Sequence, residues 1–241
     1  MTAKLSQTDA AALAEKFEKE GAETILKWTF ENYGKRAALA CSLGAEDMVL
    51  THMFLKVNPQ VRIFCLDTGR LNPETYDVLE KVREKYGYTI EVMFPATAEV
   101  ETMVKEHGMN LFYRSIEMRK LCCKVRKVNP LRRVLSTVDC WITGLRREQA
   151  VTRLSLGKAE IDDGNGGILK LNPLADWTEK MVWDYIRAND VPYNALHDGN
   201  YPSIGCAPCT RAIKEGEDVR AGRWWWEAPE YKECGLHIKS S

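Results

Sequence analysis

The sequence predicts an α/β protein built on an open, mostly parallel sheet with helices on both faces. Two observations support this prediction. Short apolar runs alternate along the chain with longer stretches of helical periodicity, which is the pattern of strand–helix–strand units. The chain has 241 residues, 45% hydrophobic and 28% charged, so it is large enough to bury the core of one such domain.

The first half of the chain supplies two predicted strands and three predicted helices. Residues 8–32 have the apolar spacing of an amphipathic helix. The apolar run 36–42 is a predicted strand and leads into a predicted helix over 45–57. A second strand over 61–69 is rich in apolar and β-branched residues. The helix predicted over 72–87 has a proline near its start and a glycine at its end, as helix termini prefer.

The second half continues the alternation as far as residue 190. We expect a third strand over 88–94 and a fourth over 140–144. Residues 168–174 are expected to form an edge strand, followed by a helix over 178–190. The polar, glycine-rich stretch 157–167 is expected to be a surface loop. Beyond it the periodicity fades, and Pro, Gly, Cys and Trp become frequent.

Composition excludes several classes of function. Lys plus Arg equals Asp plus Glu, 34 each, so the net charge indicates no nucleic-acid partner. The one basic run, between Arg114 and Arg133, is interpreted as a solvated helix face. The N-terminus lacks the apolar segment of a signal peptide, and no apolar run is long enough for a membrane span. We therefore expect a cytoplasmic protein whose eight cysteines are reduced and serve metal binding or chemistry.

Three strand ends carry glycine or polar residues. They are CSLGAED at 41–47, LDTG at 66–69 and TGLRREQ at 143–149. In open α/β sheets, ligands bind outside the carboxyl ends of the strands. The sequence therefore predicts a ligand site formed by these three segments.

The cysteines divide into a core set and a reactive set. Cys41, Cys65 and Cys140 fall in apolar strand runs and are expected to be structural. The remaining five are the adjacent pair Cys122 and Cys123, the CxxC pair Cys206 and Cys209, and Cys234. Four thiolates can hold a zinc ion or a [4Fe–4S] cluster. The spacing favours the cluster, because neighbouring side chains diverge and a cubane offers separate iron corners; zinc and unligated thiols remain the alternatives.

Cys234 is left over from a complete four-thiolate set. It stands seven residues before the end of the chain, in a polar stretch too short to build a core. Lys232 and His237 flank it and would favour the thiolate, which is the reactive form. These features suit a nucleophile; the alternative is an incidental exposed thiol.

With these segments identified, the chain resembles the assimilatory adenylyl-sulfate reductases. These belong with the phosphoadenylyl-sulfate reductases and, more distantly, with the ATP pyrophosphatases of the adenine nucleotide alpha-hydrolase fold. The resemblance covers about residues 36–237. It is carried, in order, by GAEDMVL, LDTGRLNPETY, CCKVRKVNPL, TGLRREQ, YPSIGCAPCTR, GRWWWE and KECGLH. The paired cysteines and the CAPC segment mark the branch that carries an iron–sulfur cluster.

The resemblance implies a chemistry for the tail cysteine. The Cys234 thiolate attacks the sulfur of adenylyl sulfate, expels AMP and carries an S-sulfo group. Thioredoxin, or glutaredoxin or glutathione, then releases sulfite. The resemblance also implies one [4Fe–4S] cluster per chain on Cys122, Cys123, Cys206 and Cys209. Both electrons can come from thiols, so an electrostatic and structural role is expected for the cluster.

The same resemblance assigns the substrate contacts. Cations that stabilise the phosphate and sulfate oxygens are expected at Lys127, Arg153, Arg220, Arg223 and His237. Gly144 is expected to meet the nucleotide through its backbone, and Lys127 to lie between cluster and substrate. Leu66 and Asp67 are expected on the adenine and ribose side, the alternative for Asp67 being a helix cap.

The segment CSLGAED looks like a modified form of the pyrophosphatase anion loop. Gly44 and Asp47 fit that loop, whereas Leu43 and Met48 depart from it. The lost terminal hydroxyl argues against ATP cleavage. Backbone N–H groups at Ser42, Gly44 and the following helix start are expected to cradle an anion.

One domain over 1–241 is expected, with a nucleotide-binding α/β core (36–190), a cluster-binding arm (191–226) and a mobile catalytic tail (227–241). The run Trp224–Trp226 is expected to pack beside the arm rather than stack on a base. Three alternative functions remain: reduction of 3′-phosphoadenylyl sulfate or of both nucleotides, ATP-dependent tRNA thiolation, and a non-catalytic metal module. The sequence does not determine the oligomeric state and is compatible with a homo-oligomer.

Overall fold

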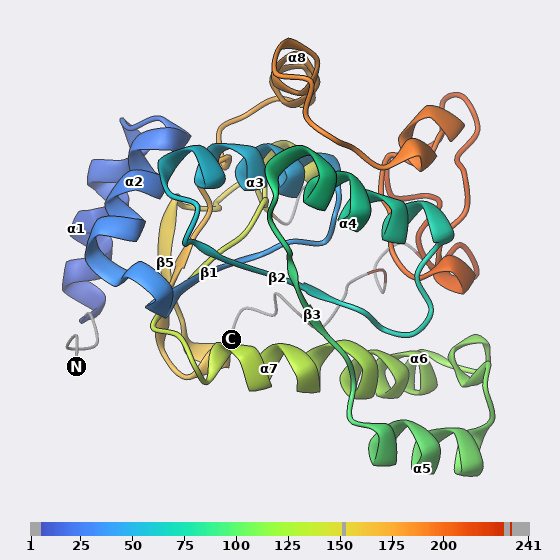
Figure 1. The fold of residues 1–241 in the computed structure, drawn as a ribbon. Helices are drawn as coiled ribbons and strands as arrows, with labels where there is room; N and C mark the ends of the chain where they lie inside the picture. The colour runs from blue at the N-terminus through green and yellow to red at the C-terminus, as the bar shows by residue number, and fades with distance from the viewer. Residues whose placement is uncertain (1–5, 151–152, 229–231, 233–241) are drawn as a thin grey trace.

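The structure is a computed structural model that describes residues 6–150, 153–228 and 232 (Figure 1). Within these residues the chain forms a six-stranded sheet with the strand order β3-β2-β1-β4-β6-β5. The strands are β1 (Ala37–Ala40), β2 (Arg62–Leu66), β3 (Glu91–Met93), β4 (Cys140–Ile142), β5 (Ala159–Asp162) and β6 (Ile168–Leu171). All neighbouring pairs are parallel except β5 with β6. The predicted open, mostly parallel sheet is confirmed.

Helices cover both faces of this sheet, as predicted (Figure 1). One face carries α1 (Gln7–Glu18), α2 (Ala22–Tyr33), α3 (Ala45–Val57), α4 (Pro73–Tyr86) and α8 (Glu179–Ala188). On the other side lie α5 (Thr97–His107), α6 (Ile116–Cys123) and α7 (Asn129–Leu135). Alternate strand residues serve the two sides: Ile63 joins the core beneath α3, and Phe64 joins the core beneath α7.

The helix predicted over 8–32 is two helices, so that prediction was wrong in its continuity. α1 ends at Glu18 and α2 begins at Ala22, with Gly21 as an extended N-cap. Glycine in a helix interior costs backbone entropy, so the chain turns there. The two helices still bury apolar residues of both halves, including Phe17 and Ile25, against the same core.

The predicted edge strand and surface loop were also assigned wrongly. β6 lies between β4 and β5, and the stretch taken for a loop contains β5, which is the edge strand. Polar Glu160 and Asp162 alternate with Ala159 and Ile161, which is the pattern of a strand with one wet face. Glu160 lies directly opposite Lys170 of β6 in the register, and their side chains form an ion pair at 2.8 Å.

The basic run 114–133 is helical, in agreement with its interpretation as a helix, but it is not one regular helix. A π-helix over Lys124–Val128 joins α6 to α7. Part of the run is also buried: Arg119 and Arg126 are 1% and 7% exposed. The run therefore contains interior cations as well as a solvated face.

After α8 the chain forms an arm of short 3₁₀ helices, η7 (Ala195–Gly199) and η8 (Ala207–Cys209). An isolated antiparallel bridge joins Thr210 to Arg223 and closes the arm on itself. A separate apolar cluster ties the arm to α5 and α6, with Phe112 on one side and Trp224 on the other. Among the described residues, no helix has the length and apolar character needed to cross a bilayer.

Candidate active site

A cavity of about 750 Å³ lies at the carboxyl ends of β1, β2 and β4, where the sequence predicted a ligand site. It gathers most of the predicted substrate-binding residues. Those that line it are Ser42, Gly44, Leu66, Lys127, Gly144, Arg153, Arg220 and Arg223. The fold therefore brings these residues together from three strand ends, the π-helix and the arm. Their contact with a substrate stays a prediction.

Asp67 is placed differently from the others. Its side chain is not part of the cavity lining. One carboxylate oxygen accepts hydrogen bonds from the Gly69 N–H at 2.7 Å and from the Tyr76 hydroxyl at 3.0 Å. Asp67 thus orders the turn after β2, and it does not cap α4, whose N-cap is Asn72.

The loop between β1 and α3 leads into the start of α3, and the anion cradle predicted there needs a correction. The Ser42 N–H donates to Asp47 at 2.6 Å and the Gly44 N–H to the Ser42 hydroxyl at 3.4 Å, so these two groups are already used within the loop and only the helix start keeps open donors. Leu43 adopts φ +64°, a left-handed conformation that costs a non-glycine residue of order 1–3 kcal/mol. Gly44 is the N-cap of α3 and provides no side-chain cap. The first N–H groups of a helix have no intrahelical acceptor, so the start of α3 offers donors to an anion in the cavity.

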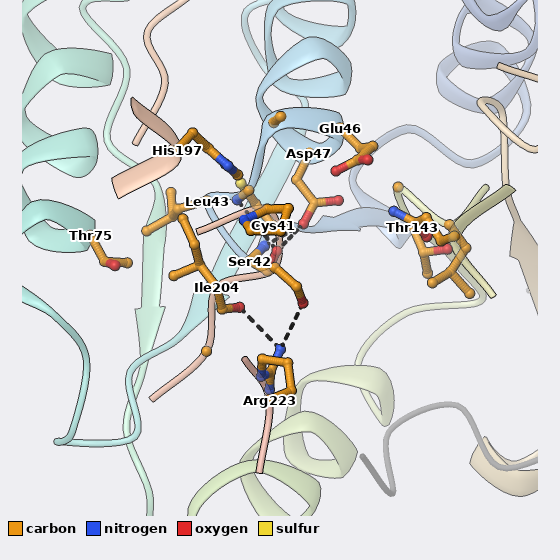
Figure 2. A pocket seen from close by; sticks show the side chains of 18 of the residues that line it. Cys41, Ser42, Leu43, Glu46, Asp47, Thr75, Thr143, His197, Ile204 and Arg223 are labelled. Atoms are coloured by element: carbon orange, nitrogen blue, oxygen red, sulfur yellow. Dashed lines mark hydrogen bonds between the residues drawn. The ribbon is translucent and has the colours of Figure 1, made fainter. Parts of the chain in front are cut away.

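Asp47 holds this loop through hydrogen bonds to Ser42 (Figure 2). Its carboxylate accepts hydrogen bonds from the Ser42 N–H and the Ser42 hydroxyl, both at 2.6 Å. The Asp47 carboxylate also accepts a hydrogen bond from the backbone of Gly144. Burial is the largest influence on this acid and raises its pKa to about 6, although the donors from Ser42 oppose the rise.

Ionisation of Asp47 is therefore expected to lower the free energy of unfolding of the protein as the pH rises. The folded-state pKa of Asp47 lies above its ordinary value of 3.8, so its contribution is complete below that value and is lost as pH passes about 6. Between about pH 4.5 and 7.5, the unfolding free energy of the wild type relative to Asp47→Asn should fall by about 2 kcal/mol. Urea unfolding across this range measures it. A difference that grows with pH would contradict the prediction, and Asp77→Asn on the exposed side of α4 is the control.

Gly144 can only be glycine in this arrangement. A Cβ built there would lie 2.3 Å from Asp47 Oδ1 and 2.9 Å from the Glu46 Cβ. Close approach of two backbones is a common reason for glycine at a site. The end of β4 thus packs directly on the start of α3, and its main chain forms a wall of the cavity.

Arg223 reaches the cavity from the arm (Figure 2). Its Nη1 donates to the Ser203 hydroxyl at 3.2 Å and to the Ile204 carbonyl at 3.3 Å. Gly205 makes room for it, because a Cβ there would lie 2.5 Å from Arg223 Nη2. Arg223 as a whole is 8% exposed. Its guanidinium is therefore a largely desolvated cation beside the anion loop.

A second, much smaller cavity contains all four predicted cluster ligands. Cys122 and Cys123 at the end of α6, and Cys206 and Cys209 of the arm, line it together. The π-helix starts immediately after Cys123, and π turns occur frequently at functional sites. Lys127 in that π-helix lines both cavities. Its position between a cluster and a substrate stays a prediction.

The surroundings of these thiols are cationic. Arg70, Arg119 and Arg126 line the cysteine cavity together with Lys127. Burial alone would raise the pKa of Cys206, but Lys127, a 3.2 Å contact with the Thr68 hydroxyl and Arg223 outweigh it, so the pKa lies below its ordinary value. Nearby cations favour thiolates, which are the form that binds metals. At Cys122 and Cys209, however, burial is the larger influence and raises the pKa of both thiols.

The four cysteines line one cavity, so a shared metal group could be held between them; its identity stays a prediction. In the described parts of the chain, no group of three or more His, Cys, Asp or Glu side chains is arranged to hold a metal ion. The Trp224 indole N–H at the wall of this cavity is buried and has no hydrogen-bond partner among the described residues. Such an orphaned donor fits an acceptor inside the cavity, such as a sulfur atom.

The tryptophan run packs beside the arm in part, because Trp226 packs against the apolar cluster but Trp225 is 40% exposed; that none of them stacks on a base stays a prediction. Trp224 is 1% exposed and packs in the apolar cluster of the arm. Several residues of this region were missed by sequence reasoning, notably Thr68, Arg119 and Glu227. The LDTG segment signalled Thr68, whereas nothing local signals that Arg119 pairs with Glu227, 108 residues away.

The described residue nearest to Cys234 in the sequence is Lys232. Arg220 Nη2 donates to its carbonyl at 2.9 Å, and Lys232 Nζ donates to the Ala221 carbonyl at 3.4 Å. Arg220 lines the large cavity, so the chain at Lys232 lies beside it. Cys234 and His237 lie outside the described residues, and their predicted roles stay predictions.

Comparison with known proteins agrees with this constellation. Residues 36–212 match the family model described as the phosphoadenosine phosphosulfate reductase domain. The chain is 54% identical over 219 residues to the adenosine 5'-phosphosulfate reductase of Burkholderia cepacia, covering 91% of this chain and 87% of that protein. It is 56% identical over 198 residues to the same enzyme of Allochromatium vinosum, covering 82% and 77%.

The structural comparison leads to the same family. The crystal structure of phosphoadenylyl-sulfate reductase from Candida auris, a phosphate complex, has a TM-score of 0.74 and 30% sequence identity. The match covers 87% of this chain and 98% of that one. On the combined ground of fold, family model and these relatives, the chain belongs to the phosphoadenosine phosphosulfate reductase domain family.

Proposed function

We propose that this chain reduces adenylyl sulfate to sulfite and AMP in sulfate assimilation. The observation that carries the proposal is the large cavity, in which Lys127, Arg153, Arg220 and Arg223 converge beside an anion loop. Relatives above 50% identity are named for adenylyl sulfate. A substrate with a phosphate and a sulfate group suits a site with several cations.

The proposed reaction begins with Cys234. Its thiolate forms a bond to the substrate sulfur, the bond from sulfur to the phosphate oxygen breaks, and AMP leaves with the electron pair. The cations around the cavity stabilise the charge that develops on the phosphate. His237 is proposed to join them.

A dithiol reductant completes the cycle. One of its thiolates attacks Cys234 Sγ, and sulfite leaves with the electrons of the broken sulfur–sulfur bond. Its second thiol then displaces Cys234 from the mixed disulfide, so the reductant ends as a disulfide. We propose thioredoxin or a glutaredoxin-like thiol as this partner, and the reducing cytoplasm as the compartment.

We also propose that Cys122, Cys123, Cys206 and Cys209 would hold a [4Fe–4S] cluster. When bound, the cluster would supply a fixed local charge and cross-link α6 to the arm. The chain's own residues prepare for it: Thr68 contacts Cys206, Lys127 lines both cavities, and Trp224 has a buried indole N–H without a partner among the described residues.

Labelling without a reductant tests the proposed function. Purified protein mixed with labelled adenylyl sulfate should release one AMP per chain and carry one sulfonate on Cys234, located by peptide mass spectrometry. Release of AMP without a protein-bound sulfonate, or a sulfonate on another residue, would contradict the mechanism.

A second substrate is favoured by a specific observation. The family description and the Candida auris structure both name the 3′-phosphorylated nucleotide. We choose adenylyl sulfate because the more similar relatives are named for it. Steady-state kcat/KM for the two nucleotides decides, and a higher value for the 3′-phosphorylated one would reverse the choice.

A further inference from the structure

A buried ion pair joins the cysteine-bearing helix to Glu227, the first residue of the tail predicted over 227–241, so the fixed part of the chain extends one residue beyond the predicted arm. Arg119 of α6 donates from Nε to Glu227 Oε1 at 3.0 Å and from Nη2 to Oε2 at 2.7 Å. The two side chains are 1% and 4% exposed. A two-point contact of this kind fixes the plane of the guanidinium as well as its position.

Arg119 in turn lies against Trp224. Its guanidinium carbon is 4.7 Å from the centre of the indole ring, and the guanidinium carbon of Arg223 is also 4.7 Å from that ring. The indole is therefore in contact with two cations. The side chains of Arg119 and Glu227 are nearly inaccessible to solvent, as is Trp224. Arg223 lines the large cavity.

The backbone at this point is strained and held from several sides. Trp224 adopts φ +40°, which is unfavourable for a bulky residue. Its N–H donates to the Cys209 carbonyl at 3.1 Å, and its carbonyl accepts from the Glu227 N–H at 2.8 Å. Strain of this kind persists only where the surroundings over-determine the conformation. Glu227 contributes to that restraint through both its backbone and its side chain.

We infer that Glu227 is a positioning residue for the anion site. It touches neither cavity. It holds Arg119, Arg119 sets the tilt of Trp224, and Trp224 supports the Arg223 guanidinium at the cavity wall. The inference rests on the proposed function only in assigning Arg223 to the substrate oxygens.

An effect of Glu227 on the position of Arg223 can be separated from an effect of its negative charge. Glu227 is the one acid in this stack of two arginines and an indole. Removing its charge makes the neighbourhood of the cavity more positive, which by itself would strengthen binding of an anion. If the Arg223 guanidinium lost its fixed orientation, binding of the anion would weaken instead. The sign of the change therefore distinguishes the two effects.

AMP binding by the iron-loaded protein tests the inference. Glu227→Gln keeps the shape and one acceptor for Arg119 but loses the charge and the two-point contact. We expect its Kd for AMP to rise about tenfold, with unchanged iron content. Glu227→Asp, which keeps the charge with a shorter reach, should lie between this variant and the wild type. The control is Glu217→Gln, because Glu217 forms a partly exposed ion pair with Arg211 at 2.8 Å in the same arm; its Kd should stay within about twofold.

A double-mutant cycle shows whether Glu227 acts through Arg223. In an Arg223→Lys background, Glu227→Gln should change the AMP Kd by no more than about twofold. An unchanged or smaller Kd for Glu227→Gln in the wild-type background would overturn the inference, as would an undiminished effect beside Arg223→Lys. If Glu227→Gln does not fold, Glu227→Asp takes its place in the cycle. Failure of the wild type itself to bind AMP would count against the proposed function instead.

Discussion

Replacing Cys234 with serine is expected to lower sulfite formation by about 10³-fold or more. A serine hydroxyl is almost entirely protonated near neutral pH, so it cannot replace a thiolate that attacks sulfur. Binding should persist, because the cations assigned to the substrate oxygens stay in place. Sulfite release with a thiol reductant and AMP binding by calorimetry measure the two effects separately.

Ser240→Ala provides the matched control, since it changes a residue of the same terminal segment that carries no thiol. Its turnover should stay within about twofold of the wild type. Normal sulfite formation by Cys234→Ser would contradict the proposed mechanism. In that case the protein would use another nucleophile or would act as a binding module.

Replacing Cys209 with alanine is expected to remove the metal group and with it the turnover of adenylyl sulfate. Cys209 lines the cysteine cavity but not the large one, so its loss should act through the metal group first. Iron should fall from about four atoms per chain to below one, and the brown absorbance of the cluster should disappear. Metal analysis and visible spectroscopy on anaerobically purified protein measure both.

The matched control is Cys140→Ala. Cys140 is fully buried in β4, and burial raises its pKa, as expected for a structural thiol. Its loss should cost stability by leaving a small cavity while iron content is kept. Iron that persists in Cys209→Ala would remove this residue from the ligand set. Zinc in place of iron in the wild type would establish the alternative that the cysteine spacing left open.

Elements with strong local signals could be predicted from the sequence. The helix expected over 45–57 is α3 at those bounds, and α4 lies within the expected 72–87, with Gly87 in the left-handed conformation at its end. The three glycine and polar segments at strand ends do surround one cavity. Each of these signals is contained within a few consecutive residues, so the sequence alone carries it.

The remaining errors have tertiary causes. β5 has polar residues because it forms the edge of the sheet, and without the partner strand its composition is that of a loop. Arg119 and Arg126 lie in a basic run, but their burial depends on Glu227 and on the Thr68 carbonyl, which are distant in the chain. A charged side chain looks solvated in a sequence until its buried partner is known.

The two edge strands of the sheet, β3 and β5, are poorly suited to pairing with a strand of another copy of the chain. β3 has only three residues, and β5 presents Glu160 and Asp162 on the opposite margin. Short or charged margins are poor templates for adding a strand from another molecule, and they protect native proteins from aggregation. If copies of this chain associate, we expect them to meet through helices or the arm, leaving each sheet complete within its own subunit.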